Sequence, residues 1–212
     1  PLIHYEEDGL FLAWNDQEVY GLHLQGDGEL VEGWSSDGII LFASEEERGY
    51  PIISNDGEGG IITCSKWSDY PVSKLYIQRT SGSGETIWDE DLEIMETEST
   101  LHVADFLVNS FGDIIIVYGK RVVEQKELNA RKVDLDGNFL WDEPLQLYTG
   151  IGVSNSLHLI ETDPGNYIVT WGGTAQTISS DYIAATKFNA DAEICWESPF
   201  YQEAEWTNLI ID

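Results

Sequence analysis

A hairpin pattern that recurs at a near-constant period is the feature that most constrains the fold of this chain. Its clearest copy, residues 128–144, reads L-N-A-R-K-V-D-L-D-G-N-F-L-W-D-E-P. An Asp-Gly dipeptide between alternating runs of β-favouring residues predicts a tight hairpin. Further copies occupy residues 75–90, 183–198 and, more loosely, 19–34. Four structural repeats are therefore predicted, because the turn residues are 56, 53 and 55 positions apart: Gly28, Gly84, Gly137 and Ala192.

Each repeat contains a second hairpin upstream of the first, again with a glycine-containing turn. Four strands are therefore predicted in every repeat, the first of them at residues 2–5, 51–54, 101–107 and 157–161. The fourth strand is expected to run through Trp88, Trp141 or Trp196, with these rings in the core. No segment predicts a helix. Residues 120–127 lack an apolar stripe at helical spacing and are predicted to form a polar loop.

Repeated four-stranded antiparallel units are typical of a β-propeller, in which every unit forms one blade. We therefore predict an all-β propeller of about four 53-residue blades, or an arc of a larger propeller. One domain is expected, with units near residues 1–48, 49–99, 100–152 and 153–205, and the start of a further unit at 206–212. That surplus first strand would leave an apolar edge, so self-association through the terminal blades is expected.

The acidic composition excludes two classes of partner. The chain has 39 acidic against 10 basic residues and a formal net charge of −29, which repels nucleic acid and anionic lipid surfaces. No apolar run is long enough for a membrane-spanning helix, so no membrane insertion is expected. The carboxylates occur in every unit, which favours a solvated acidic surface over a single acidic site. Adaptation to saline or calcium-rich surroundings is the alternative.

The two cysteines, Cys64 and Cys195, exclude zinc ribbons and thioredoxin-like sites because neither belongs to a C-x-x-C pair. Both lie in predicted strands, where buried free thiols are the favoured interpretation and a disulfide is the alternative. The chain begins within a strand-like pattern, without an initiator methionine or a signal peptide. This beginning indicates a piece of a longer protein.

A histidine or a basic residue stands five positions before each turn residue, in a chain with only 10 Lys and Arg in all: His23, Arg79, Lys132 and Lys187. The favoured interpretation is an ion pair with a carboxylate on a neighbouring strand. A role in ligand binding is the alternative.

Two acidic turns carry the oxygen ligands that calcium prefers, and calcium is the one cofactor considered. Asp134, Asp136 and Asn138 lie in one turn, and Asn55 and Asp56 lie in the other. Neither turn continues to the distant Glu of an EF-hand. Turn chemistry alone also requires Asp, Asn and Gly at such positions, so structural turns are the alternative.

Two histidines and two loop aromatics complete the candidate sites. His102 and His158 hold matching places at the start of a first strand. First strands line the channel of a propeller, so the pair can share a metal there; hydrogen-bonded channel residues are the alternative. Trp67 and Tyr70 lie in a polar segment between two strands, and exposed rings there suit contacts with sugars or proteins. Packing over the blade edge is the alternative.

Catalytic residues are not predicted. The chain has no G-x-S-x-G motif, and the spacing of the 39 acids singles out no pair of carboxylates for glycosidase chemistry.

Three motifs carry a resemblance to known proteins: P-x-I-x-x-D-G-x-G-G-I-I at residues 51–62, L-Y-I-Q-R at 75–79 and G-x-x-x-W at 84–88. They resemble the tandem propeller-like repeats of large secreted or cell-surface bacterial proteins, over nearly the whole chain. The resemblance implies an extracellular or cell-surface location and a scaffold architecture, and it assigns no activity.

We therefore expect a non-catalytic, secreted or surface β-propeller scaffold that binds a protein or a glycan. A carbohydrate-active hydrolase of propeller fold is one alternative, and a calcium-dependent adhesion module is another. Acids with perturbed titration gathered at one place would favour the enzyme, whereas a uniformly acidic face would favour the scaffold.

Overall fold

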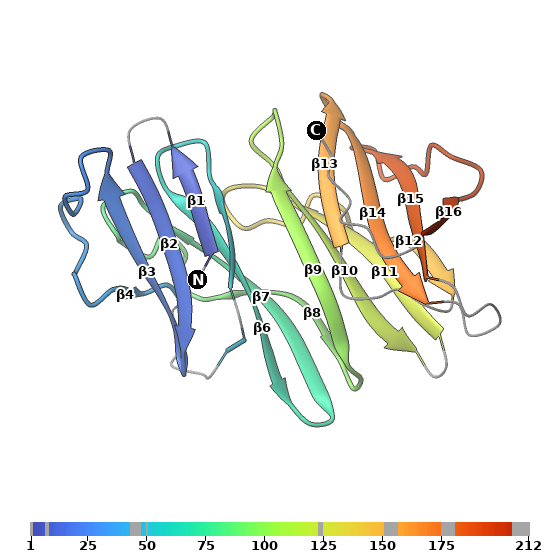
Figure 1. Cartoon of the computed structure of the whole chain (residues 1–212), viewed down its shortest axis with the longest axis horizontal. Coiled ribbons are helices and arrows are strands. Elements are labelled where there is room, and N and C mark those ends of the chain that lie inside the picture. Colours follow the sequence, from blue (N-terminus) through green and yellow to red (C-terminus); the bar gives the residue numbers. More distant parts are fainter. Residues whose placement is uncertain are drawn as a thin grey trace. The chain divides into compact units, whose positions relative to one another are not determined.

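The computed structural model describes residues 2–6, 9–42, 48–49, 51–122, 125–150, 157–174 and 181–204. Within these ranges the chain forms β-strands and no α-helix, which confirms the predicted all-β class. The strands build four antiparallel sheets of four strands each, and consecutive strands are neighbours in every sheet (Figure 1). No helix in the described part of the chain is long and apolar enough to cross a membrane.

Each sheet lies within one of the four predicted repeats. Sheet 1 consists of β1 (Leu2–Glu6), β2 (Gly9–Asp16), β3 (Glu18–Gln25) and β4 (Ile39–Ile40). Sheet 2 consists of β5 (Ile52–Asn55), β6 (Ile61–Asp69), β7 (Val72–Thr80) and β8 (Leu92–Thr97). Sheet 3 consists of β9 (Leu101–Val108), β10 (Ile114–Val122), β11 (Gln125–Val133) and β12 (Leu145–Gly150). Sheet 4 consists of β13 (Leu157–Asp163), β14 (Asn166–Thr174), β15 (Asp181–Asn189) and β16 (Phe200–Ala204).

Two local predictions are wrong. Residues 120–127 are not a loop, because β10 and β11 extend into this segment from both sides. An ion pair between Lys120 Nζ and Glu127 Oε2, at 3.2 Å, joins the two strands there, which explains how polar side chains continue a hairpin. The fourth strands also begin later than predicted, since β8, β12 and β16 all start after the tryptophan of their repeat.

The chain divides into two compact units. Unit 1 comprises Pro1–Leu101, Gly112–Ile114 and Val133–Asn138; unit 2 comprises His102–Phe111, Ile115–Lys132 and Phe139–Asp212. The predicted further unit at residues 206–212 lies outside the described residues.

In unit 1, the core lies between sheets 1 and 2. Side chains alternate between buried and half-buried along β2, which is the period-two pattern of a strand with one covered face. The buried face of β2 packs with residues of the second sheet, including Ile53 and Ile61. The first strands of the two sheets, β1 and β5, are in contact.

In unit 2, the core lies between sheets 3 and 4 and contains several aromatic rings. Its buried members include Trp141, Tyr167, Trp171 and Phe188. The first strands again approach each other, because the carboxylate of Asp105 on β9 accepts a hydrogen bond from the backbone of β13. In both units, neighbouring sheets therefore approach through their first strands.

Candidate functional site

The turns between the third and fourth strands share one geometry in all four sheets. They are five-residue turns in which the first residue donates to the fifth and the fourth donates back to the first. They comprise residues 25–29, 81–85, 134–138 and 189–193. The fourth residue is left-handed, with φ of 88° at Gly28, 85° at Gly84, 86° at Gly137 and 61° at Ala192. Glycine adopts this conformation without steric cost, whereas alanine adopts it at a steric cost because of its Cβ.

A tryptophan of one sheet reaches the turn of the next sheet in three equivalent places. Each indole Nε1–H donates to the carbonyl of the second turn residue: Trp34 to Gly82 at 2.8 Å, Trp88 to Leu135 at 3.1 Å, and Trp141 to Ala190 at 3.0 Å. We call this arrangement the tryptophan–turn contact. It links the tryptophan of each of these three sheets to the turn of the sheet that follows in the sequence.

The predicted ion pair of the repeated basic position is present at Arg79. Its guanidinium bonds Asp56 Oδ2 at 2.8 Å and Glu58 Oε2 at 2.6 Å. The same side chain also donates to the Leu135 carbonyl at 3.2 Å, beside the indole of Trp88. His23 plays a related part, since its Nδ1 lies 3.2 Å from the Gly82 carbonyl and its ring stacks on Phe11.

The oxygens of the two predicted calcium turns take part in hydrogen bonds within their turns. Asp134 accepts from the backbone of Asp136 and from the backbone and side chain of Asn138. Partial burial opposes ionisation of Asp134, but the hydrogen bonds from Asn138 and the neighbouring backbone hold its pKa below the usual value. Asp136 is exposed. These bonds give the turn a structural function, and calcium binding stays a prediction.

In the second turn, Asn55 accepts from Gly57, and Asp56 Oδ1 accepts from Glu58 and from Gly60. Asp56 is 2% exposed and pairs with Arg79, so its charge is already compensated. Among the residues that the structure describes, no three His, Cys, Asp or Glu side chains gather closely enough to hold a metal ion.

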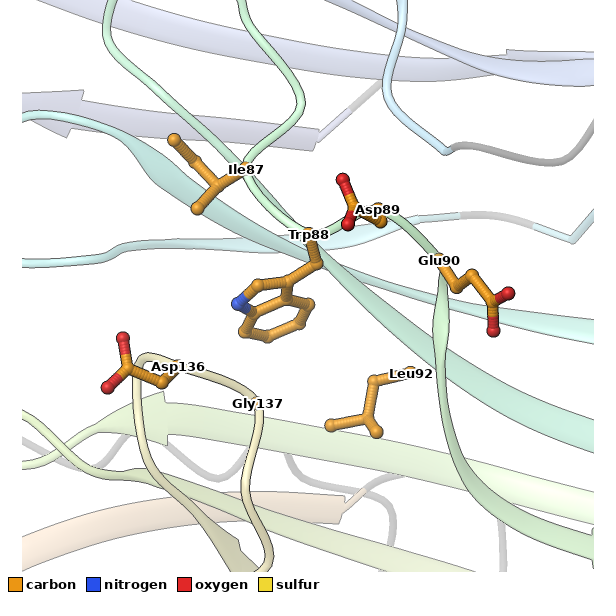
Figure 2. Close-up of a pocket in the computed structure, with 7 residues that line it drawn as sticks. All are labelled: Ile87, Trp88, Asp89, Glu90, Leu92, Asp136 and Gly137. Atoms are coloured by element: carbon orange, nitrogen blue, oxygen red, sulfur yellow. The ribbon is translucent and has the colours of Figure 1, made fainter.

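A pocket of about 330 Å³ lies beside Trp88 in unit 1. Figure 2 shows the Trp88 indole directed toward the turn that carries Asp136 and Gly137. Leu92 and two further acidic residues, Asp89 and Glu90, also line the pocket. The ring belongs to a tryptophan–turn contact, and this explains its half-buried position. The carboxylates give the pocket hydrogen-bond acceptors suited to hydroxyl groups.

Sequence reasoning missed Asp105, which lies on the first strand of sheet 3. Its Oδ2 accepts from Leu159 N at 2.8 Å, and its Oδ1 accepts from Phe106 N at 3.0 Å. Burial raises the pKa of Asp105; the two backbone donors and the charge of His158 oppose the rise without cancelling it. The signal in the sequence was an acid within the apolar run L-H-V-A-D-F-L-V.

Glu161 lies on β13, two residues beyond the amide that bonds Asp105. It accepts hydrogen bonds from Ser110 N at 2.8 Å, Ser110 Oγ at 3.0 Å and Gly165 N at 2.8 Å. An ionised carboxylate has about four acceptor sites, so one further donor can be bound. The two acids therefore occupy adjacent first strands of unit 2 in different surroundings.

Of the two histidines, His158 is exposed on β13, and His102 belongs to β9 with a side chain outside the described residues. A shared metal at this pair stays a prediction. The predicted position between two strands is wrong for Trp67, which lies near the end of β6 and is half-buried; Tyr70 in the following turn is 96% exposed. Glycan or protein contact by these two rings also stays a prediction.

Neither cysteine forms a disulfide, as favoured, but only Cys64 is buried. The prediction of a buried Cys195 in a strand is wrong. Cys195 lies in the segment between the sheet 4 turn and β16, where its side chain is exposed.

Comparison with solved structures gives the fold. An endo-arabinase from Bacteroides thetaiotaomicron VPI-5482 matches with a TM-score of 0.60 and 14% identity, over 91% of this chain and 75% of that one. A thermostable family-43 glycoside hydrolase matches with a TM-score of 0.55 and 10% identity, over 88% of this chain and 67% of that one. No family model and no curated protein matches. The β-propeller fold predicted from the repeats is thus confirmed.

These comparisons correct the functional expectation. The similar structures are an endo-arabinase and a glycoside hydrolase, which contradicts the non-catalytic scaffold and favours the alternative, a carbohydrate-active hydrolase of propeller fold. Propeller-like repeats are supported, whereas the context of a large secreted protein stays an expectation.

Proposed function

We propose that this chain is a propeller-fold glycoside hydrolase that acts on a polysaccharide, with an arabinan as the first substrate to test. The likeness to the endo-arabinase supports the fold of such an enzyme, and the observation that carries the proposal is the pair of acids on β9 and β13. An extracellular or cell-surface location belongs to the proposal, because polysaccharides are too large to enter a cell intact.

Asp105 has the properties of a general acid. Glycoside hydrolysis needs a carboxylic acid that stays protonated until it donates to the leaving oxygen, and enzymes obtain it by raising the pKa of one carboxyl. Burial raises the pKa of Asp105, which lies on β9, the first strand of sheet 3.

Glu161 has the properties of the partner base. Three donors fix its carboxylate, and the remaining acceptor site is available to a water molecule. Leu159 and Glu161 are two residues apart, about 6.8 Å along a strand. Inverting enzymes hold their two carboxyls roughly 6.5–9.5 Å apart, and the proposal assigns this arrangement to Asp105 and Glu161.

The reaction then follows directly from these two roles. Asp105 gives its proton to the glycosidic oxygen as the bond from that oxygen to the anomeric carbon breaks. Glu161 accepts a proton from the water whose oxygen forms the new bond to the same carbon. One water is consumed, the configuration at the anomeric carbon inverts, and proton exchange with solvent restores both acids.

The test is release of reducing sugar from a panel of polysaccharides that includes linear and branched arabinan. Asp105→Asn and Glu161→Gln should each lower kcat/KM by about 10²–10⁴-fold, the usual range for loss of a general acid or base. Asp163→Asn is the matched control, because this exposed acid lies on the same strand as Glu161.

The pH profile separates catalysis from a structural role. Asp105 must be protonated to act, so kcat/KM should fall as the pH rises through its raised pKa, and this limb should disappear in Asp105→Asn. Folded, purified protein that cleaves no member of the panel would refute the proposal. Equal activity of the Asp105 variant would refute the role of that residue.

A further inference from the structure

The turn between β9 and β10 carries a phenylalanine that neither the turn nor the core requires. Phe111 is 65% exposed, and its N donates to Asn109 Oδ1 at 2.9 Å. The turn between β5 and β6 has the same hydrogen bond, from Gly57 N to Asn55 Oδ1. Sheet 2 therefore makes this bond with a glycine, a usual turn residue, and the exposed ring of sheet 3 is an addition to it.

The backbone that carries the ring is held by sheet 4. The buried side chain of Asn109 donates from Nδ2 to the hydroxyl of Tyr167 at 2.7 Å. Ser110 donates to Glu161 from its backbone N at 2.8 Å and from its hydroxyl at 3.0 Å. Both residues directly precede Phe111. A ring on a backbone fixed in this way loses little conformational freedom when a ligand binds.

Phe111 lies beside the carboxylate proposed as the catalytic base. Gly165 N donates to Glu161 Oε1 at 2.8 Å. A Cβ built on Gly165 would lie 3.3 Å from Phe111 Cε2. The ring and the carboxylate therefore have Gly165 as a common neighbour, and a ligand that reaches the free acceptor site of Glu161 is close to the ring.

We propose that Phe111 stacks on a sugar unit of the polysaccharide, close to the unit at which Glu161 acts; this inference rests on the proposed function. A sugar ring has a face of C–H groups that packs on an aromatic ring, and hydroxyls at its edge that donate to carboxylates. The net charge of −29 disfavours an acidic polysaccharide. The substrate class is therefore a neutral polysaccharide, bound through at least two sugar units.

Affinity electrophoresis in gels that contain polysaccharides measures binding separately from cleavage. The panel holds linear and branched arabinan, other neutral polysaccharides and one rich in uronic acid. Asp105→Asn is the background for every variant, so that the polysaccharide stays intact during the run.

Phe111→Ala should weaken binding by about 10-fold. Phe111→Leu should weaken it similarly, because leucine keeps an apolar contact with Gly165 but has no ring face. Phe111→Trp should bind at least as tightly as phenylalanine. Phe200→Ala is the matched control and should leave binding unchanged, since it removes a ring of similar exposure, 57%, from β16 of the same unit. Thermal unfolding of each variant checks that it is folded.

Kinetics provide a second readout. In the otherwise unaltered chain, Phe111→Ala should raise KM by about 10-fold and leave kcat nearly unchanged, the result expected when binding common to substrate and transition state is lost.

The binding and cleavage assays fail independently. A chain that binds a neutral polysaccharide but cleaves none refutes the hydrolase, and the Phe111 variants still decide whether the ring stacks on sugar. Undiminished binding by Phe111→Ala and Phe111→Leu, or no binding of any neutral polysaccharide by the background chain, would overturn the role of Phe111. Preference for the uronic acid polymer would overturn the neutral substrate class.

Discussion

The two units of this chain stabilise the same repeat by different means. Unit 1 places guanidinium groups inside its sheets: Arg48 pairs with Asp91 at 2.6 Å, and the two side chains are only 1% and 5% exposed. The Arg48 guanidinium also lies 4.4 Å from the ring centre of Phe42 and 4.3 Å from that of Tyr76. In unit 2, an apolar contact of rings lies in the core between sheets 3 and 4, where Trp141 packs edge-on against Phe188.

This difference predicts how each unit responds to change. Apolar packing loses free energy in proportion to the volume removed, and its loss is largely independent of salt. A buried ion pair contributes little net stability, but removal of one partner leaves the other charge without compensation. Unit 2 should therefore be sensitive to loss of size, and unit 1 to loss of one charge.

The largest effect is expected for a ring of unit 2. Trp141 is 8% exposed, so Trp141→Ala should lower the free energy of unfolding by about 3–5 kcal/mol. The equivalent change in unit 1, Trp88→Ala, should cost less, because the ring is half-buried and Arg79 also holds the Leu135 carbonyl. Urea unfolding of both variants measures the difference. Equal losses would show that the two contacts are equivalent.

A smaller effect is expected at the charged position of unit 1. Arg79→Lys keeps the charge but loses the planar fork that bonds Asp56, Glu58 and Leu135 at once. The free energy of unfolding should fall by about 1–3 kcal/mol, the usual cost of leaving a buried acceptor unsatisfied. Lys187→Arg at the equivalent position in unit 2 is the control, and a similar loss there would argue against this explanation.

The smallest effect concerns a tyrosine of unit 2. Partial burial and hydrogen bonding with Tyr148 raise the pKa of Tyr201 to about 12, from 10.0. A raised pKa in the folded state means that its contribution to stability is complete below pH 10.0 and is lost as the pH rises through about 12. Melting temperatures measured across this window should fall less in Tyr201→Phe. The change is small because Tyr201 is 49% exposed.

Local patterns of the sequence were enough to predict the strands and the turns. An Asp-Gly or Gly-rich turn determines a hairpin through its backbone conformation, so the strands on either side can be located from the turn. The predicted bounds of the first strands therefore agree with those of β1, β5, β9 and β13 to within about two residues. The tryptophan–turn contact could not be predicted in this way, because the acceptor lies about 50 residues away in the next repeat. Trp34 was not predicted to be equivalent to Trp88, Trp141 and Trp196, because it follows its turn residue by six positions and they follow theirs by four.

The candidate site was harder to predict than the fold. The role proposed for Asp105 depends on its partial burial and on its hydrogen bond to the neighbouring sheet, and neither property appears in composition or spacing. The basic position could be predicted because it repeats, and the ion pair of Arg79 confirmed that interpretation.

The tryptophan–turn contact also bears on how such a chain can arise. Donor and acceptor lie on one repeat, so a duplicated gene segment of this length encodes a new unit whose two faces already match its neighbours. Each added copy then extends the array in one direction only, as monomers with a distinct head and tail extend a polymer. A substitution that improves the tryptophan or the turn is inherited by every later duplicate. The number of repeats can therefore change during evolution without the invention of a new interface.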